Sequence, residues 1–308
     1  MKNTITFVYP IKRSFVQTDL RILSELKTKV FEIHSPPLKG FQFFTNRARE
    51  IFLSIRFVFK SNHLICLFND YHSFFPILIS NLFMKKTILI IGGYDAIVDK
   101  KSKHGLFYKK GLRAIIGKLN YMLAKEVWVV HKSLESGCPQ AYYDNGIISG
   151  IRNLINKKKL NIKEVSTGYD SEFWKNTKSQ KRNSVVTVAF FNSKRVLDIK
   201  GIKTKEELRD IYSDHKYYFQ GSRLEGLPNS LCEAMLCECI PIGSAYFGIP
   251  DAIGDAGLIF NHSNSIQTVV DFILGLKNDK LSLKARQRII SNFNIKSRKQ
   301  HFNDILIK

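Results

Sequence analysis

The sequence predicts an α/β protein with two doubly wound domains. Short apolar segments rich in β-branched and aromatic residues alternate with segments of helical length along the chain of 308 residues. A turn-like stretch, residues 166–174 (STGYDSEFW), divides this alternation into two halves. Apolar residues make up 44% of the chain and no low-complexity tract interrupts it, so each half is expected to bury its own core.

In the first half, strands are expected where the apolar segments are short. They fall at residues 4–9, 30–33, 64–68, 87–91 and 126–130, with helices at residues 15–27, 46–60, 73–83 and 109–124. Strands joined by helices of this length form parallel βαβ units. Ligands of such sheets bind at the carboxyl ends of the strands.

The second half repeats the pattern over fewer residues. Strands are expected at residues 184–191, 216–220, 239–243 and 257–260, and helices at residues 205–212, 230–236, 265–276, 282–291 and 297–307. We therefore predict an N-terminal domain at residues 1–168, a C-terminal domain at residues 169–294 and a last helix at residues 295–308.

The first half is the basic half of a chain whose formal net charge is +22. Residues 1–168 hold 27 Lys and Arg against 11 Asp and Glu, a net charge of +16, which leaves +6 for residues 169–308. A basic surface favours anionic lipid head groups, nucleic acid or a phosphorylated ligand. A lysine-rich composition without any such partner is the open alternative. Nucleic acid ranks last, because the basic residues are not interleaved with an aromatic RNP-like pattern.

The lengths of the apolar runs and the number of cysteines indicate the cellular compartment of the protein. No run reaches the roughly 20 residues that a membrane span needs, and the first residues, MKNTITFVYP, lack the apolar core of a signal peptide. We expect a cytoplasmic protein. Its five cysteines are an odd number, so buried thiols are expected rather than a disulfide framework or a metal site.

Two glutamates stand in the segment EGLPNSLCEAM, residues 225–235. Glu225 falls in a loop between an expected strand and an expected helix, and the amides that begin such a helix form an anion site. Beside a diphosphate, a carboxylate is best used to accept hydrogen bonds from sugar hydroxyls. Glu233 has two open interpretations, because Ser230 and Glu233 also match the S-x-x-E pattern of a capping box.

Other candidate site residues follow strands in both halves. Arg195 and Lys200 come after the strand expected at residues 184–191, where they could hold a diphosphate leaving group. The stretch GGYD, with Gly92, Gly93 and Asp95, follows the strand at residues 87–91 and could approach a ligand through its backbone. His72 is a possible contact to an acceptor, although a surface histidine or one at a helix start is the commoner case.

Several sequence patterns with known chemistry are missing. No D-x-D pair for a metal-bound nucleotide occurs, nor a phosphate-binding loop, a G-x-S-x-G elbow or a G-x-G-x-x-G fingerprint. These absences disfavour NTPases, serine hydrolases and nicotinamide enzymes.

Residues 222–260, SRLEGLPNSLCEAMLCECIPIGSAYFGIPDAIGDAGLIF, resemble the signature segment of glycosyltransferase family 4. The pattern is two glutamates eight residues apart, a proline-containing strand, a G-x-P turn and a short G-L-I-F strand. ITFVYPIKRSFVQTDLRILSEL resembles the first βα unit of the family, VSTGYDSEFWK its interdomain segment, and FNIKSRKQHFNDIL its closing helix, which crosses back to the first domain. The resemblance covers most of the chain.

This resemblance implies a GT-B fold, with two Rossmann-like domains facing a central cleft, and a retaining, metal-independent enzyme. Position by position, it implies that Glu225 contacts the donor sugar and Glu233 the ribose. Arg195 and Lys200 would bind the diphosphate. The remaining donor contacts would come from Gly226, Asn229, Ser230, Leu231 and Gly248.

The expected function is transfer of a hexose-type sugar from a UDP- or GDP-linked donor, without a cofactor. The acceptor would be a glycan or a lipid-linked glycan of cell-surface polysaccharide or lipopolysaccharide synthesis, at the inner face of the membrane. Only residues 202–205 separate Gly201 from Glu206, whereas the family has further βα units there. The second domain is therefore expected to be abbreviated, and the alternative is a catalytically impaired binding or partner protein.

Overall fold

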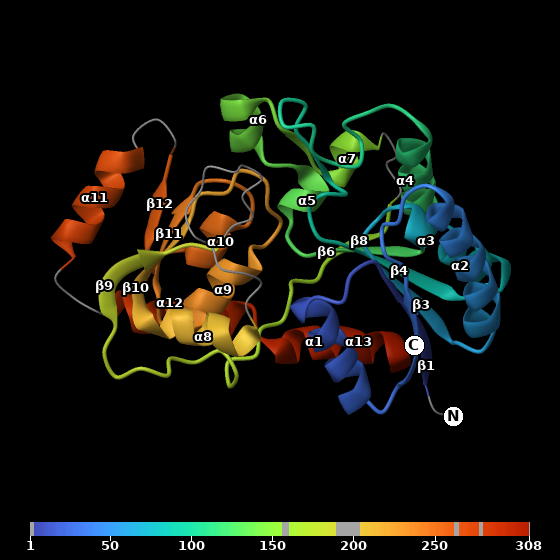
Figure 1. The fold of residues 1–308 in the computed structure, drawn as a ribbon, viewed down its shortest axis with the longest axis horizontal. Coiled ribbons are helices and arrows are strands. Elements are labelled where there is room, and N and C mark those ends of the chain that lie inside the picture. The colour runs from blue at the N-terminus through green and yellow to red at the C-terminus, as the bar shows by residue number, and fades with distance from the viewer. Residues whose placement is uncertain (1–2, 156–159, 189–203, 262–264, 277–279, 308) are drawn as a thin grey trace. The chain divides into compact units, whose positions relative to one another are not determined.

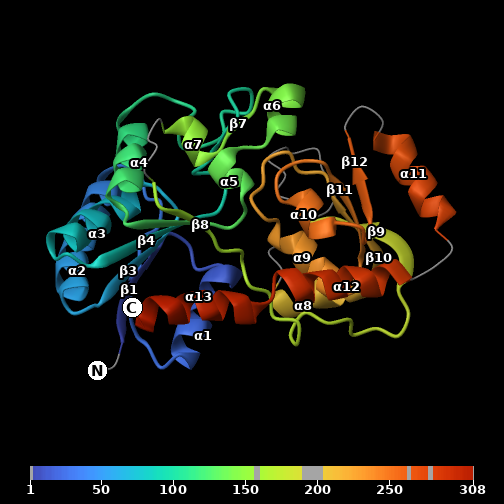
Figure 2. The ribbon, with the colours of Figure 1, turned by 180° about the vertical axis from the view of Figure 1, so that it is seen from behind.

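The computed structural model describes residues 3–155, 160–188, 204–261, 265–276 and 280–307 (Figures 1 and 2). The chain divides into two compact units. Unit 1 comprises Met1–Gly168 and Lys296–Lys308, and unit 2 comprises Tyr169–Ile295.

Unit 1 is built on a six-stranded parallel sheet in the order β2-β1-β3-β4-β6-β8. Its strands are β1 (Thr4–Tyr9), β2 (Lys29–His34), β3 (His63–Leu67), β4 (Lys86–Ile91), β6 (Glu126–Val129) and β8 (Ile162–Glu164). The central strands are apolar and buried on both faces, which is the pattern of a parallel sheet covered by helices. The strand order reverses between β1 and β3, so this is the point where a doubly wound sheet binds ligands.

Helices cover both faces of this sheet. They are α1 (Ser14–Glu25), α2 (Phe41–Phe59), α3 (Tyr71–Leu82), α4 (Leu112–Leu123) and α13 (Ile295–Ile307), with the short α5 (Ser133–Ser136), α6 (Pro139–Asn145) and α7 (Ile151–Leu154) near the sheet edge. Figures 1 and 2 show α13 lying beside α1, on the opposite face from α2 and α3. The ring of Phe302, on α13, packs 5.4 Å from that of Trp128, on β6, and both side chains are fully buried.

Unit 2 has a four-stranded parallel sheet among its described residues, in the order β12-β11-β10-β9. The strands are β9 (Arg182–Val186), β10 (His215–Gln220), β11 (Ile240–Ser244) and β12 (Leu258–Phe260). Its helices are α8 (Lys205–Asp214), α9 (Asn229–Leu236), α10 (Ile249–Ile253), α11 (Ser265–Gly275) and α12 (Lys280–Asn292). A capping box starts α8, since Thr204 accepts from the Glu207 amide and Glu207 accepts from the Thr204 amide.

The expected strands and helices of the first half are all present, with ends that shift by a few residues. Residues 4–9 form β1 as predicted, whereas α2 begins at Phe41, five residues before the predicted start. Three strands were missed: β8 and the antiparallel pair β5 (Ile97–Val98) and β7 (Ile148–Ser149). In the second half β9 spans residues 182–186, and the end of the strand predicted at residues 184–191 lies outside the described residues.

The predicted state of the cysteines is mostly confirmed. All five are free, and all except Cys138, which is half-buried, are buried. The Cys239 thiol donates to the backbone oxygens of Tyr212 and His215, at 3.0 and 3.3 Å, as a small core residue does.

Candidate functional site

The first candidate site lies in unit 2, where β10 runs through a loop into α9. Glu225 stands in this loop and is half-buried. Its Oε1 accepts hydrogen bonds from Ser222 Oγ at 2.7 Å and from Gln220 Nε2 at 3.3 Å. Gln220 is itself held by the Tyr218 hydroxyl, which donates to Gln220 Oε1 at 3.1 Å. The Glu225 carboxylate is therefore positioned by a short chain of side-chain contacts from the end of the strand.

The environment of Glu225 is partly buried. Burial raises the pKa of Glu225 above its ordinary value, and the hydrogen bond from Ser222 opposes that rise. A partly buried carboxylate with a fixed orientation is suited to accept hydrogen bonds from hydroxyl groups of a ligand.

Glu233 does not cap the helix. α9 begins at Asn229, Pro228 is the N-cap residue, and no side-chain hydrogen bond caps this end. The capping box expected from Ser230 and Glu233 is therefore wrong, because Ser230 is already inside the helix, where its Oγ lies 3.5 Å from Gln220 Oε1. Glu233 is 7% exposed, and burial raises its pKa to about 8, with Lys205 as an opposing positive charge.

The first turn of α9 offers its backbone rather than its side chains. The Leu231 side chain is fully buried, so only its amide can face a ligand. The side-chain oxygen of Asn229 already accepts from the Tyr169 hydroxyl at 2.8 Å. The free amides and the dipole of this helix end remain as an anion site.

Two glycines tie the neighbouring loops together. The amide of Gly248 donates to the backbone oxygen of Gly226 at 3.0 Å. The Ser244 hydroxyl adds a second link by donating to the backbone oxygen of Ser222 at 2.7 Å. The structure thus brings Glu225, Gly226, Gly248 and the start of α9 to one end of the sheet. Arg195 and Lys200 lie outside the described residues.

A second candidate site is a pocket of about 1040 Å³ in unit 1, at the point where the strand order reverses. The segments that follow β1, β2, β3 and β4 line it, together with the start of α2 and one residue of α4. Its lining combines aromatic rings with cationic side chains; among them are Phe15, Phe43, Phe68, Arg13, Arg47 and Arg113.

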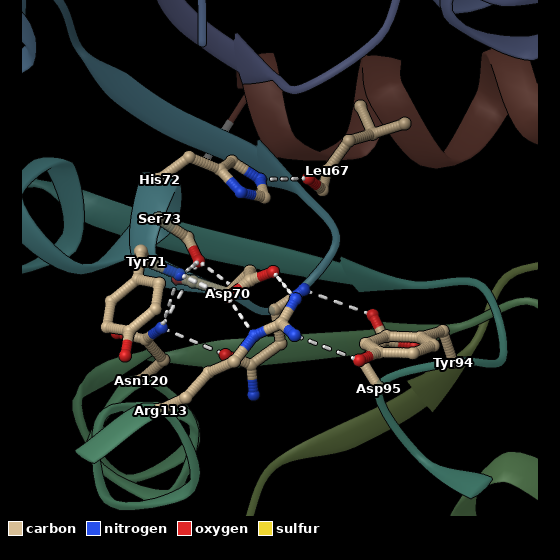
Figure 3. A network of polar contacts seen from close by, with 10 residues as sticks. Leu67, Asp70, Tyr71, His72, Ser73, Tyr94, Asp95, Arg113 and Asn120 are labelled. Carbon is tan, nitrogen blue, oxygen red and sulfur yellow. Dashed lines mark hydrogen bonds and ion pairs between the residues drawn. The ribbon is translucent and has the colours of Figure 1, made fainter. Parts of the chain in front are cut away.

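An ion pair dominates the polar part of this pocket (Figure 3). Arg113, from α4, donates to both carboxylate oxygens of Asp70, with Nε 2.9 Å from Oδ1. Arg113 also donates to the Tyr94 hydroxyl at 3.1 Å and lies over the Tyr94 ring. The Arg113 contact holds the pKa of Asp70 below its ordinary value although burial opposes it. Asp70 also starts α3 through a capping box with Ser73.

Arg47 is the residue of the pocket with unused donors. Its Nη2 donates to Ser35 Oγ at 2.8 Å and lies 2.6 Å from Glu50 Oε1, while its Nε and Nη1 are buried and have no hydrogen-bond partner among the described residues. Buried guanidinium donors without partners are costly.

All four predicted acceptor-side residues line this pocket. Asp95 is buried and accepts from the amides of Gly93 and Asn69, at 3.0 and 3.1 Å, so its carboxylate joins the turns after β4 and β3. Burial raises the pKa of Asp95 to about 6. His72 donates from Nε2 to the backbone oxygen of Leu67 at 2.7 Å, and burial lowers its pKa. Gly92 faces the Phe68 ring, which fills the space that a side chain at this glycine would need.

Three residues of this pocket were not predicted from the sequence: Asp70, Arg113 and Arg47. Asp70 follows an apolar strand and precedes a helix, so its role as the N-cap of that helix could have been predicted from the sequence. The pairing of Asp70 with Arg113, 43 residues later, depends on the packing of α3 against α4 and leaves no local pattern.

Comparisons with known proteins agree with this architecture. Residues 170–294 match the family model described as glycosyl transferases group 1, and no curated protein matches the chain in sequence. Sucrose-phosphate synthase of Thermosynechococcus elongatus superposes with a TM-score of 0.68 at 12% identity, over 99% of this chain and 98% of that one. A glycosyltransferase from Rickettsia africae gives 0.62 at 12% identity, over 99% and 98%.

The third structure is HepE of Anabaena in complex with UDP. It gives a TM-score of 0.65 at 10% identity and covers 99% of both chains. At such identities the likeness establishes the fold alone, and the predicted α/β class with parallel sheets is confirmed. The chain has the GT-B fold of glycosyltransferases, and its residues 170–294 carry the sequence pattern of glycosyl transferases group 1.

Proposed function

We propose that this protein is a retaining, metal-independent glycosyltransferase of family 4. It moves a hexose-type sugar from a UDP- or GDP-linked donor to a glycan or lipid-linked acceptor in cell-surface polysaccharide synthesis. The observation that carries the proposal is the position of Glu225, a partly buried and oriented carboxylate just before the free amides of α9, within the segment that matches glycosyl transferases group 1.

In this proposal the donor lies along the end of the unit 2 sheet. Glu225 accepts hydrogen bonds from hydroxyls of the sugar, and Glu233 accepts them from the ribose. The amides of Asn229, Ser230 and Leu231 face the diphosphate, whose charge grows as the bond to the sugar breaks. Arg195 and Lys200 would add positive charge there. A UDP or UDP-glucose complex of HepE, which has the same fold at 10–11% identity, supports a nucleotide sugar as donor.

The acceptor side of the proposal is the pocket of unit 1. Its aromatic rings suit the faces of sugars or an apolar chain, and the arginines of its lining suit a phosphate. Such an acceptor would be met at the cytoplasmic face of the membrane. The net charge of +16 on residues 1–168 supports this location, and none of the described helices is long and apolar enough to span a bilayer.

The test is release of UDP or GDP from a panel of UDP- and GDP-sugars in the presence of a membrane extract that supplies acceptors. We expect turnover with one donor, which falls roughly 10- to 100-fold in Glu225→Gln, the loss expected for hydrogen bonds to a charged group. Glu206→Gln is the matched control, because Glu206 is an exposed glutamate of the same unit. NMR of the product should show the anomeric configuration of the donor.

Three results would change the proposal. Unchanged turnover in Glu225→Gln would remove the assignment of this site. A product of inverted configuration would remove the retaining mechanism. Binding of UDP in calorimetry without turnover of any donor would favour the alternative, a glycosyltransferase-like binding or partner protein.

A further inference from the structure

Helix α2 has an inverted distribution of polar and apolar residues. Its buried face carries Asn46, Glu50 and Ser54, along with Val58. Its exposed face carries an aromatic and aliphatic stripe, the α2 stripe, formed by Phe41, Phe44, Phe52, Ile55 and Phe59, each of them between 51% and 81% exposed. A helix on the surface of a protein that faces only water has the opposite arrangement.

The α2 stripe is continuous. The spacing of its residues and of Ala48 places them within an arc of roughly 80° along the whole of a helix about 28 Å long. At the C-terminal end of α2, the ring of Phe59 lies 5.5 Å from that of Phe83, and the exposed Leu82 and Met84 flank Phe83 in the chain. Apolar patches of this extent on an exposed surface mark interaction sites.

Cationic side chains border the α2 stripe. Arg49, Arg56 and Lys60 are exposed along one side of the same helix. The acidic residue of α2 is Glu50, which is completely buried, so α2 presents no negative charge to the solvent. Aromatic residues in the middle of such a face and basic residues beside it suit the boundary between lipid head groups and acyl chains.

We propose that the α2 stripe is the surface by which unit 1 binds an anionic membrane. The aromatic rings enter the interface, and Arg49, Arg56 and Lys60 contact the anionic head groups. A second copy of this chain fits less well, since two such faces would bring like charges together, on a chain whose net charge is already +22. The α2 stripe is also continuous with the pocket of unit 1, because Phe43, Phe44 and Arg47 line that pocket from the first turns of the same helix.

The inference rests on the proposed function for its choice of a membrane, but its test needs no sugar donor. Full-length protein is centrifuged with vesicles of phosphatidylcholine alone and with vesicles in which one third of the lipid is phosphatidylglycerol. We expect binding to the anionic vesicles that is about tenfold stronger than binding to the neutral ones and that weakens with added salt. The variant Phe52→Ser/Phe59→Ser should lose about tenfold in binding, because two exposed aromatic anchors are removed.

The control variant is Ile266→Ser/Leu274→Ser, which removes two equally exposed apolar side chains from α11 in unit 2. It should bind vesicles like the unchanged protein. Loss of binding in Phe52→Ser/Phe59→Ser alone, with an unchanged melting temperature, supports the α2 stripe. Equal vesicle binding by both variants overturns the proposal. A dimer in solution that Phe52→Ser/Phe59→Ser dissociates also overturns it, because the α2 stripe would then bind a second copy of the chain.

A spectroscopic reporter gives a second measurement. Trp128 and Trp174 are both buried, so a tryptophan introduced by Phe52→Trp reports on the α2 stripe. Its emission should shift to shorter wavelength with anionic vesicles and be quenched by lipids brominated on the acyl chain; emission that does not change overturns the proposal. Nucleotide release in solution is measured separately, so vesicle binding without turnover counts against the proposed function and not against the α2 stripe.

Discussion

The guanidinium of Arg298 and the carboxylate of Asp19 form a buried, two-point ion pair. Nε lies 2.5 Å from Oδ1 and Nη2 lies 2.7 Å from Oδ2. Arg298 also donates from Nη1 to the backbone oxygens of Val165 and Ser166, so its donors are used on two segments of unit 1, α1 and the stretch that follows β8. The pair joins α13 to α1 across 279 residues of sequence.

Removing one partner of this pair should strongly destabilise unit 1. In Arg298→Met the Asp19 carboxylate stays buried without its counter-charge, and we expect a loss of about 3–5 kcal/mol in the free energy of unfolding. Denaturation in urea measures it. Lys299→Met is the control, because Lys299 pairs with Glu25 at the surface and should cost less than about 1 kcal/mol. Equal effects of the two changes would contradict the prediction.

Glu233 should make the stability of unit 2 depend on pH. Its pKa is about 8 in the folded chain against 4.5 as the ordinary value, so the folded state holds a proton that the unfolded state has lost between these values. The stabilising contribution is complete below pH 4.5 and is lost as the pH rises towards 8. Glu233→Gln stays neutral, and its stability relative to the unchanged protein should therefore rise from pH 5 to pH 8.

Melting temperatures of the two proteins across this pH range measure the effect. Burial also raises the pKa of Glu50, in unit 1, to about 8. The stability of both proteins therefore falls further with rising pH for this second reason. The difference between the two curves is therefore the quantity of interest, and curves that run parallel would show that Glu233 keeps its charge when folded.

Ser222 should influence turnover through Glu225. Ser222→Ala removes the hydrogen bond that opposes the rise of the Glu225 pKa, so that pKa should move further up. If the ionised carboxylate is the active form, the acidic limb of the rate profile moves to higher pH and turnover at neutral pH falls roughly 2- to 10-fold. Adding Ser222→Ala to Glu225→Gln should change nothing more, and an additive loss would show that Ser222 acts elsewhere.

Gly92→Ala should disturb the pocket of unit 1. The added methyl group would overlap Cε1 of the Phe68 ring, which has to move. We expect a loss of about 1–3 kcal/mol in stability, the usual cost of overpacking. The double variant Gly92→Ala/Phe68→Leu should recover part of it, because a smaller side chain leaves room for the methyl group. No recovery would mean that the backbone at Gly92, rather than the ring, causes the loss.

Burial decides how far the sequence could predict this fold. The strands of the unit 1 core are continuous apolar runs because helices cover both faces, and each was predicted to within one residue at either end. β8 and the β5–β7 pair are two or three residues long, too short to leave a periodic signal. The boundaries of α2 were misplaced because its apolar residues at the N-terminal end face outwards.

In the candidate sites, local features could be predicted from the sequence, whereas contacts between distant segments could not. The loop position of Glu225 followed from its place between a strand and a helix. The capping interpretation of Ser230 and Glu233 was wrong because Pro228 is the N-cap residue and the helix begins at Asn229, one residue before Ser230. Contacts such as Asp70 with Arg113 are fixed by how helices pack, and no spacing along the chain encodes them.

The chain of unit 2 is inserted within that of unit 1, and this sets an order of synthesis. A ribosome makes all of residues 169–295 before it makes Arg298, the partner of Asp19. Until then α1 lacks both the counter-charge of Asp19 and the helix that lies beside it. The unit whose translation begins first therefore stays incomplete until the last helix is made, and it keeps apolar surface exposed during that time.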